Sequence, residues 1–163
     1  MVERRRFEYR RTLTADVPSG GAFAAPSAFA RSALAAVLLD AYRGTIDDEG
    51  ETLEDAVDFV DDALDRALDG VSFVAESAGA PIGFCLVTLV HDVHYVDPIV
   101  VAPTWKQQRI GTALVETSLG ALARRGVGEV GAVITEGNVA SESLFASLGF
   151  ELVGPWPPAP PAV

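Results

Sequence analysis

Residues 101–114 read Val-Ala-Pro-Thr-Trp-Lys-Gln-Gln-Arg-Ile-Gly-Thr-Ala-Leu, and this stretch decides how the whole chain is interpreted. It predicts the end of a strand, a short loop after Pro103 and a helix that begins near Gly111. The first amides of a helix have no partner inside it and lie at its positive end, so such a junction can bind a phosphate. Lys106 and Arg109 add positive charge beside these amides. Junctions of this kind also occur for purely structural reasons, so the pattern alone leaves both roles open.

A second stretch, residues 138–150, reads Asn-Val-Ala-Ser-Glu-Ser-Leu-Phe-Ala-Ser-Leu-Gly-Phe. It predicts a short helix ended by Gly149, after a buried strand over residues 129–135. Residues 101–114 resemble motif A of the GNAT family of N-acetyltransferases, which is typically Val-x-Pro-x-Tyr-Arg-Gly-x-Gly-x-Gly-x-Ala-Leu. Residues 138–150 resemble the second signature of that family, Asn-x-x-Ala-x-x-Leu-Tyr-x-x-x-Gly-Phe. The two motifs stand in the order of the family, with a strand between them.

The resemblance implies an α/β protein with the GNAT fold. In that fold a central mixed, mostly antiparallel sheet is flanked by helices, and one strand splays from its neighbour at the acyl-CoA site. Acetyl-CoA is the implied acyl donor. The splayed strand would bind its pantetheine arm, the loop amides would cradle its pyrophosphate, and the second motif would lie along the arm, with Phe145 near the thioester sulfur. The residues implied to bind the cofactor are Ile99, Val100, Val101, Lys106, Gln107, Gln108, Arg109, Ile110, Gly111, Thr112, Asn138, Ser141 and Phe145.

The sequence departs from the family pattern at several positions. Lys106 stands where arginine or glutamine is usual, which keeps the charge but loses the bidentate fork of arginine. Arg109 stands at a glycine position, so the backbone there must accommodate a Cβ. Phe145 replaces the tyrosine that often protonates the departing thiolate, so this role is vacant or filled elsewhere. Val133 and Ile134 stand where some members that acetylate amino termini carry a glutamate.

Two residues are candidates for the proton transfers. An amine must lose a proton to attack a thioester, so a base or a water path has to accept it. Asp97 lies two residues before Ile99, where polyamine-acetylating relatives carry a carboxylate, and it is our first candidate for the base. Its alternative role is that of a strand-end or turn aspartate before Pro98. Tyr95, on the same face, matches the place of the base in histone-acetylating relatives and is the second candidate, as an acid or a substrate-orienting group.

The remaining pattern predicts the elements around these motifs. A first strand over residues 7–11 leads to a turn at residues 18–21. Two helices follow, the first capped by Ser27 and the second with an acidic outer face. Next come three antiparallel strands, a helix, a strand, a helix and a last strand at residues 150–153. We expect one GNAT domain over residues 1–154 and an extended, Pro-rich C-terminal tail over residues 155–163.

Composition narrows the function further. A formal charge of −11 argues against nucleic acid and against an anionic membrane surface, because both require a basic footprint. The single cysteine, Cys85, rules out an internal disulfide, and two histidines are too few for a convincing metal site. Residues 22–39 are rich in alanine, but Pro26 and Arg31 interrupt them. We therefore expect an amphipathic helix of a cytoplasmic protein rather than a signal peptide.

The leading hypothesis is an N-acyltransferase that moves an acetyl or other short acyl group from acyl-CoA to a primary amine by direct attack on the thioester. The acceptor is a small molecule or a peptide, and a homodimer is common in similar proteins. Two alternatives stay open: a CoA-binding sensor or interaction module without catalysis, and a phosphate-binding domain that does not bind CoA. The sequence names neither the amine nor the acyl chain length.

Overall fold

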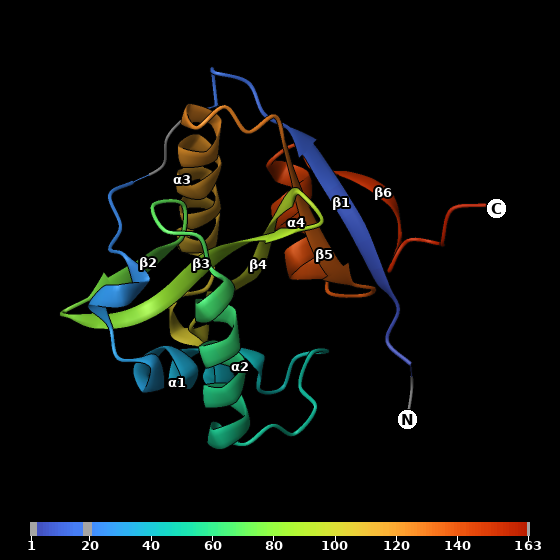
Figure 1. Cartoon of the computed structure of the whole chain (residues 1–163). Coiled ribbons are helices and arrows are strands. Elements are labelled where there is room, and N and C mark those ends of the chain that lie inside the picture. Colours follow the sequence, from blue (N-terminus) through green and yellow to red (C-terminus); the bar gives the residue numbers. More distant parts are fainter. Residues whose placement is uncertain (1–2, 18–20, 163) are drawn as a thin grey trace.

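A six-stranded sheet forms the centre of the protein, with the strand order β2-β3-β4-β5-β1-β6 (Figure 1). The computed structural model describes residues 3–17 and 21–162, so most of the turn expected at residues 18–21 lies outside the described residues. Neighbouring strands are antiparallel except for β4 and β5, which are parallel. The expected mixed, mostly antiparallel sheet is therefore confirmed. The strands are β1 (Arg6–Thr12), β2 (Phe73–Ser77), β3 (Ala80–Val90), β4 (Val93–Val101), β5 (Glu129–Thr135) and β6 (Glu151–Trp156).

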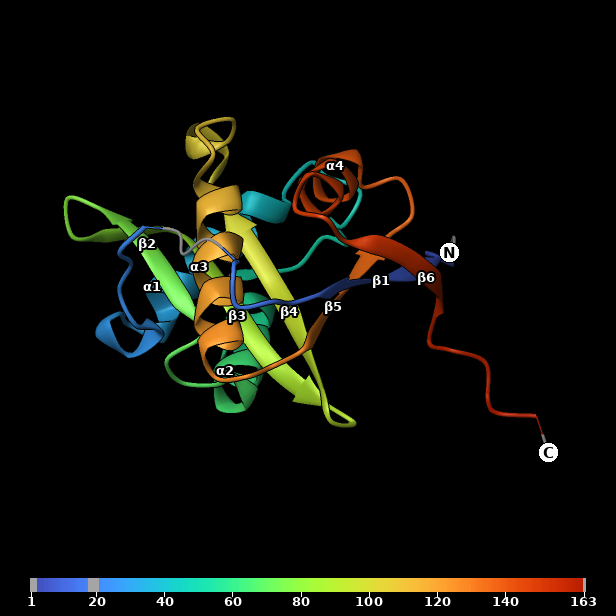
Figure 2. The same ribbon diagram turned by 90° about the horizontal axis from the view of Figure 1, so that it is seen from above.

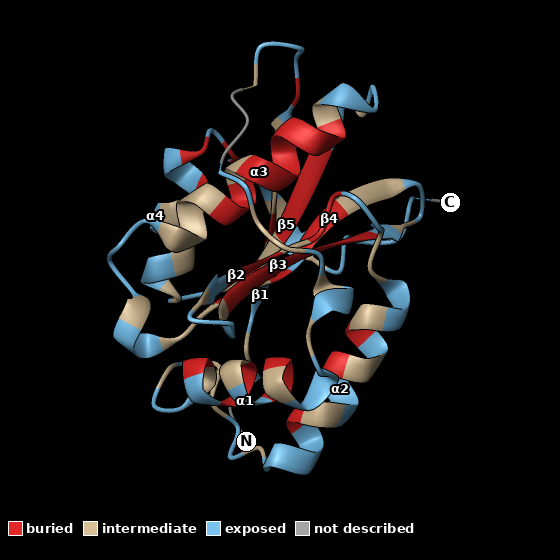
Figure 3. Ribbon diagram, turned by 90° about the vertical axis from the view of Figure 1, so that its left-hand side faces the viewer, coloured by how far each residue is buried: buried red, intermediate tan, exposed pale blue. Residues whose placement is uncertain are grey.

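Helices cover both faces of the sheet. The helices α1 (Arg31–Tyr42) and α2 (Leu53–Arg66) lie on one face, and α3 (Ile110–Arg124) and α4 (Val139–Ser147) lie on the other (Figure 3). Alternation along β3 feeds both layers: Phe84 and Leu86 pack against α1 and α2, while Cys85 and Val87 pack against α3. Among the described residues, no helix has both the length and the apolar character needed to cross a membrane.

The N-terminal ends of α1 and α2 differ. Thr52 and Asp55 form a reciprocal capping box at the start of α2, and the aspartates of its outer face are solvated. Ser27, in contrast, does not cap α1. It lies inside a short 3-10 helix (Pro26–Ala28), and α1 begins only after Ala30, without a side-chain cap. The prediction at Ser27 was wrong because Pro26 starts a separate turn of helix before α1.

The parallel pair of β4 and β5 is short, and the two strands part in the middle of the sheet. Their ladder joins residues 94–96 to residues 130–132 and ends there in the described structure. In the pairing of β3 with β4, Cys85 lies opposite Ile99 and Val87 lies opposite Val96. One residue separates the pairs on β3 and two, Asp97 and Pro98, separate them on β4, so β4 carries one extra residue there. This bulge changes which face the later residues occupy: Val96 packs on the α3 side and Val100 on the α1–α2 side. The splayed strand expected from the sequence is thus confirmed.

The last strand is longer than residues 150–153. Its pairing with β1 continues through Pro155 opposite Phe7 and Trp156 opposite Arg6. The first two residues of the expected tail therefore belong to the sheet. Residues 157–162 have no regular structure and lead away from the sheet (Figure 2).

Gly131 of β5 gives a test of packing at the point where β4 and β5 are still paired. A Cβ at this position would lie 2.7 Å from Cδ1 of the Tyr95 ring, which is too close for two carbon atoms. We expect Gly131→Ala to displace the ring and to lower the free energy of unfolding by about 1–3 kcal/mol, as overpacking typically does. Thermal unfolding measures this change. Gly128→Ala is the matched control, because a Cβ there meets no atom within 4 Å; equal stability of the two variants would contradict this packing.

Candidate active site

The loop between β4 and α3 has the backbone shape that the sequence pattern implied. Gln107 and Arg109 both have left-handed backbone, with φ of +68° and +62°. Both stand where the family pattern has glycine, the residue that adopts this region without a Cβ penalty. Arg109 is the N-cap of α3, which has neither a side-chain cap nor an acidic residue in its first turn. Its first amides are therefore available to an external anion.

A cavity of about 600 Å³ lies against this loop and the start of α3. Of the residues expected to bind the cofactor, those that line this cavity are Ile99, Val100, Val101, Lys106, Gln107, Arg109, Ile110, Gly111, Thr112, Asn138 and Ser141. Gln108 lies in the loop but does not line this cavity, and Phe145 lines a neighbouring one. The structure thus brings the two sequence motifs together on one concave surface, named the cofactor groove below.

The end of β4 offers one free backbone edge to the cofactor groove. Ile99, Val100 and Val101 pair with β3 on one side. On the other side the ladder with β5 has already ended at Val96, so this edge has no strand partner among the described residues. A strand edge carries N–H and C=O groups that need hydrogen bonds. An extended, amide-containing chain can supply them.

The start of α4 closes the other side of the groove. Asn138 is the N-cap of α4, and its side-chain oxygen accepts a hydrogen bond from the Ser141 backbone N–H (3.2 Å). Its side-chain Nδ2 donates to Asp47 Oδ2 (2.9 Å), in the loop between α1 and α2. Asn138 therefore caps its helix and also joins α4 to the loop on the far side of the splay.

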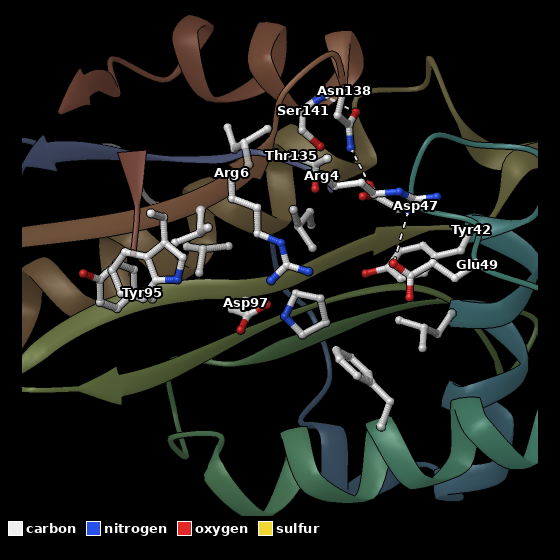
Figure 4. Close-up of a pocket in the computed structure, with 18 of the residues that line it drawn as sticks. Arg4, Arg6, Tyr42, Asp47, Glu49, Tyr95, Asp97, Thr135, Asn138 and Ser141 are labelled. Atoms are coloured by element: carbon white, nitrogen blue, oxygen red, sulfur yellow. Dashed lines mark hydrogen bonds and ion pairs between the residues drawn. The ribbon is translucent and has the colours of Figure 1, made fainter. Parts of the chain in front are cut away.

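A second cavity, of about 520 Å³, lies between the α1–α2 layer and the splayed ends of β4 and β5 (Figure 4). Tyr95, Asp97 and Phe145 all line it. We name it the acceptor cavity. It shares five lining residues with the cofactor groove: Tyr42, Asp47, Ile99, Asn138 and Ser141. The two cavities therefore meet at the splay.

Asp97 projects into the acceptor cavity from the bulge of β4 (Figure 4). Asp97 is exposed to solvent through the cavity, and the protein atoms around the cavity only partly desolvate its carboxyl group. This desolvation raises the pKa of Asp97, and the positive charges of Arg66 and Arg6 only partly oppose the rise. A carboxylate with a raised pKa is a better proton acceptor than an ordinary aspartate. Asp97 lies within β4 and not at a strand end.

Comparison with known proteins agrees with this geometry. The model of the acetyltransferase (GNAT) family matches residues 33–150, from within α1 to the last residue of the second motif. This chain belongs to the GNAT family. Members of the family are generally acetyl-CoA-dependent N-acetyltransferases. Among curated protein sequences, none matches the chain.

Solved GNAT structures share the fold. A GCN5-related N-acetyltransferase from Sphaerobacter thermophilus superposes with a TM-score of 0.69 at 20% identity, over 93% of this chain and 49% of that one, so this chain spans about half its length. The ribosomal-protein-S18-alanine N-acetyltransferase from Escherichia coli gives 0.58 at 23%, over 88% and 77% of the two chains. An aminoglycoside N-acetyltransferase in complex with CoA gives 0.58 at 18%, over 93% and 92%.

Tyr95, the second candidate for a proton-transfer role in this GNAT site, is fixed by contacts with Glu8 and Trp156. Its hydroxyl donates to the buried carboxylate of Glu8, which also accepts from Arg10 Nε (3.0 Å). Its ring packs edge-on against Trp156 at a centroid distance of 5.5 Å. Burial and the hydrogen bond to Glu8 both raise the pKa of Tyr95. The ring therefore forms a rigid wall of the acceptor cavity, with its proton directed toward Glu8.

Two residues of this site were given no chemical role by the sequence, although the loop over residues 41–50, which includes Tyr42, was expected to line the substrate entrance. Tyr42, at the end of α1, lines both cavities, and burial raises its pKa, with further contributions from Asp97, Asp47 and Glu51. Arg6 of β1 extends into the acceptor cavity (Figure 4). A tyrosine in an apolar helix and an arginine in an arginine-rich segment carry no local signal of function. Only the fold places them at the splay.

Proposed function

We propose that this GNAT protein transfers an acetyl or other short acyl group from acyl-CoA to a primary amine by direct attack on the thioester. The observation that carries the proposal is the meeting of the cofactor groove and the acceptor cavity at the splay of β4 and β5. At this junction an acyl group held by one cavity is accessible from the other. A donor and an acceptor can therefore be held together, which converts a bimolecular reaction into a local one.

Four features of the cofactor groove suit CoA. The unpartnered edge of Ile99–Val101 suits the amide-bearing pantetheine arm, and the uncapped start of α3 suits the pyrophosphate. Lys106 and Arg109 line the same groove and supply positive charge in a strongly acidic chain. When bound, acetyl-CoA supplies an electrophilic thioester carbonyl and a sulfur leaving group. The side chain of Gly111 is only a hydrogen, which leaves room beside Val101 for the ligand.

On the acceptor side, the proposal gives Asp97 the role of general base. Its carboxyl group lines the acceptor cavity two residues before the unpartnered edge of β4, and desolvation raises its pKa. An amine that enters the cavity can give its proton to Asp97, directly or through a water molecule. The Tyr95 ring, fixed by Glu8 and Trp156, bounds the space in which the amine is positioned.

Tyr42 is the proposed source of the proton for the leaving sulfur, in the role that Phe145 cannot fill. Its hydroxyl is a proton donor, and its side chain lines both cavities. We expect Tyr42→Phe to lower kcat on the order of 10-fold or more, since general acid catalysis commonly contributes at least that much. Steady-state kinetics with saturating acetyl-CoA measure the effect. Tyr9→Phe, outside both cavities, is the control; wild-type kcat in Tyr42→Phe would remove Tyr42 from this role.

The experiment that tests the proposal is an acetyl-CoA turnover assay with a broad panel of primary amines. Release of free CoA thiol and the mass of the N-acylated product are followed together. We expect stoichiometric thiol and product with at least one class of amine. The competing proposal, a CoA-binding sensor, is favoured by the buried phenyl ring of Phe145 at the usual tyrosine position. CoA binding by calorimetry without turnover of any amine would support the sensor and contradict the enzyme.

A further inference from the structure

The acceptor cavity is lined by charged side chains of both signs, and most of them are already engaged. Arg4 pairs with Glu49 (3.6 Å) and donates to the Asp48 carbonyl (3.0 Å). Asp47 accepts from Asn138. Two further carboxylates of the lining accept hydrogen bonds from nearby backbone amides: Glu51 from the Glu49 N–H and Asp55 from the Thr52 N–H. These contacts hold the side chains of the α1–α2 loop and the start of α2 in place. The hydrogen bonds from neutral donors leave the charges of Asp47, Glu51 and Asp55 uncancelled.

Two charged groups of the acceptor cavity differ from the rest. The side chains of Arg6 and Asp97, both reached by solvent, form no ion pair and no hydrogen bond with any other residue that the structure describes. Arg6 pairs with Thr135 at the end of β5, whereas Asp97 belongs to β4. They therefore project into one cavity from opposite sides of the splay, one positive and one negative (Figure 4).

We propose that the acceptor is a small zwitterion, an amine that carries a carboxylate close to its amino group, with the carboxylate bound by Arg6 and the amine presented to Asp97. This inference rests on the proposed function and names its substrate class. An arginine binds a carboxylate through two parallel N–H groups, which fixes orientation as well as charge. A second ammonium group in place of the carboxylate would face the Arg6 guanidinium and be repelled.

The acceptor cavity also has aromatic side chains that can contact the apolar part of such a molecule. Phe59, Tyr95 and Trp156 line the acceptor cavity. The reaction then balances simply: the amine nitrogen bonds to the acyl carbon, the carbon–sulfur bond breaks, Asp97 receives the amine proton, and Tyr42 supplies a proton to the sulfur. Arg6 takes no part in these bonds. It is a positioning residue that decides which amine is held at the splay.

The test compares amino acids with their own carboxamides. Initial rates with acetyl-CoA are measured for the common L-amino acids, for the same amino acids as carboxamides, and for putrescine, cadaverine and spermidine. The wild-type protein is expected to prefer a carboxylate-bearing acceptor. In Arg6→Gln, the ratio of kcat/KM for the acid to kcat/KM for its carboxamide should fall about 10–100-fold, as expected for the loss of a charge-assisted hydrogen bond. The two amines differ in basicity, but this difference cancels when the ratio in the variant is compared with the ratio in the wild type.

Arg5→Gln is the matched control. It makes the same charge change one residue earlier. The Arg5 side chain is exposed, as that of Arg6 is, but it pairs with Glu136 and does not line the cavity. The ratio should stay at its wild-type value there. A wild-type preference for diamines or carboxamides, or an unchanged ratio in Arg6→Gln, would overturn the zwitterion proposal and leave the acetyltransferase proposal standing. Turnover of no acceptor at all would contradict the proposed function, and the zwitterion proposal with it.

Discussion

Replacement of Gly111 by aspartate is expected to lower the affinity for CoA by about 10²-fold or more. A Cβ at Gly111 points between Val101, at 3.4 Å from its Cγ2, and Leu144, at 3.8 Å, and both residues line the cofactor groove. The added carboxylate would stand in the first turn of α3, where the pyrophosphate is expected. Two like charges about 4 Å apart repel by about 4 kcal/mol at the effective dielectric of a protein surface, so the predicted loss is within reach of electrostatics alone.

Calorimetric titration with CoA measures this loss, and thermal unfolding checks the fold. Stability should not fall, because an acidic residue in the first turn of a helix is favourable. Gly111→Ala is the steric control: its Cβ makes only a tight contact with Val101, and the charge is unchanged. It should bind CoA far better than Gly111→Asp. Near wild-type affinity in Gly111→Asp would show that the start of α3 does not hold the pyrophosphate.

Asp97→Asn is expected to lower turnover on the order of 10²-fold or more while CoA affinity stays close to that of the wild type. The amide keeps the shape of the side chain but removes the basic oxygen, and general base catalysis commonly contributes this much. The acidic limb of the rate–pH profile should also flatten, because Asp97 no longer titrates. Asp92→Asn makes the same charge change in the turn between β3 and β4, outside both cavities, and should leave turnover unchanged.

Stability separates catalysis from structure in the Asp97→Asn variant. Because desolvation raises the folded-state pKa of Asp97, the folded protein binds more protons than the unfolded chain between the ordinary and the raised pKa. Ionisation of Asp97 therefore costs stability as the pH rises through that window. The variant should be at least as stable as the wild type at neutral pH, with no gain at a pH below the ordinary pKa. A less stable variant with wild-type turnover would show that Asp97 has only a structural role.

Local patterns predicted most of the fold because short-range spacing carries it. The bounds of β5 coincide with the strand predicted over residues 129–135, β4 ends at Val101 as predicted, and α3 begins one residue before Gly111. The start of α1 was misplaced because the pattern contained both a capping-type serine and a proline, and the proline set its own turn. The extension of β6 through Pro155 was also missed, because a proline usually indicates the end of a strand. Here it is accommodated because β6 is an edge strand, the place in a sheet where proline is tolerated.

The cofactor half of the site was more predictable than the acceptor half. The loop after β4 and the start of α4 are each encoded within a dozen residues, so a motif can reveal them. The contacts that shape the acceptor cavity join residues far apart: Asn138 and Asp47 are separated by 91 positions, and Tyr95 and Glu8 by 87. Arg6 likewise reaches the splay only through the topology of the sheet, and no local spacing could have indicated it.

The central claim is that donor and acceptor occupy the two joined cavities together and that the amine attacks the thioester directly. Initial rates measured while both acetyl-CoA and the best amine are varied test this claim most directly. The geometry predicts intersecting lines in double-reciprocal plots, the pattern of a ternary complex. Parallel lines, together with an acetyl group carried covalently by the protein between the two half-reactions, would contradict direct transfer at the splay.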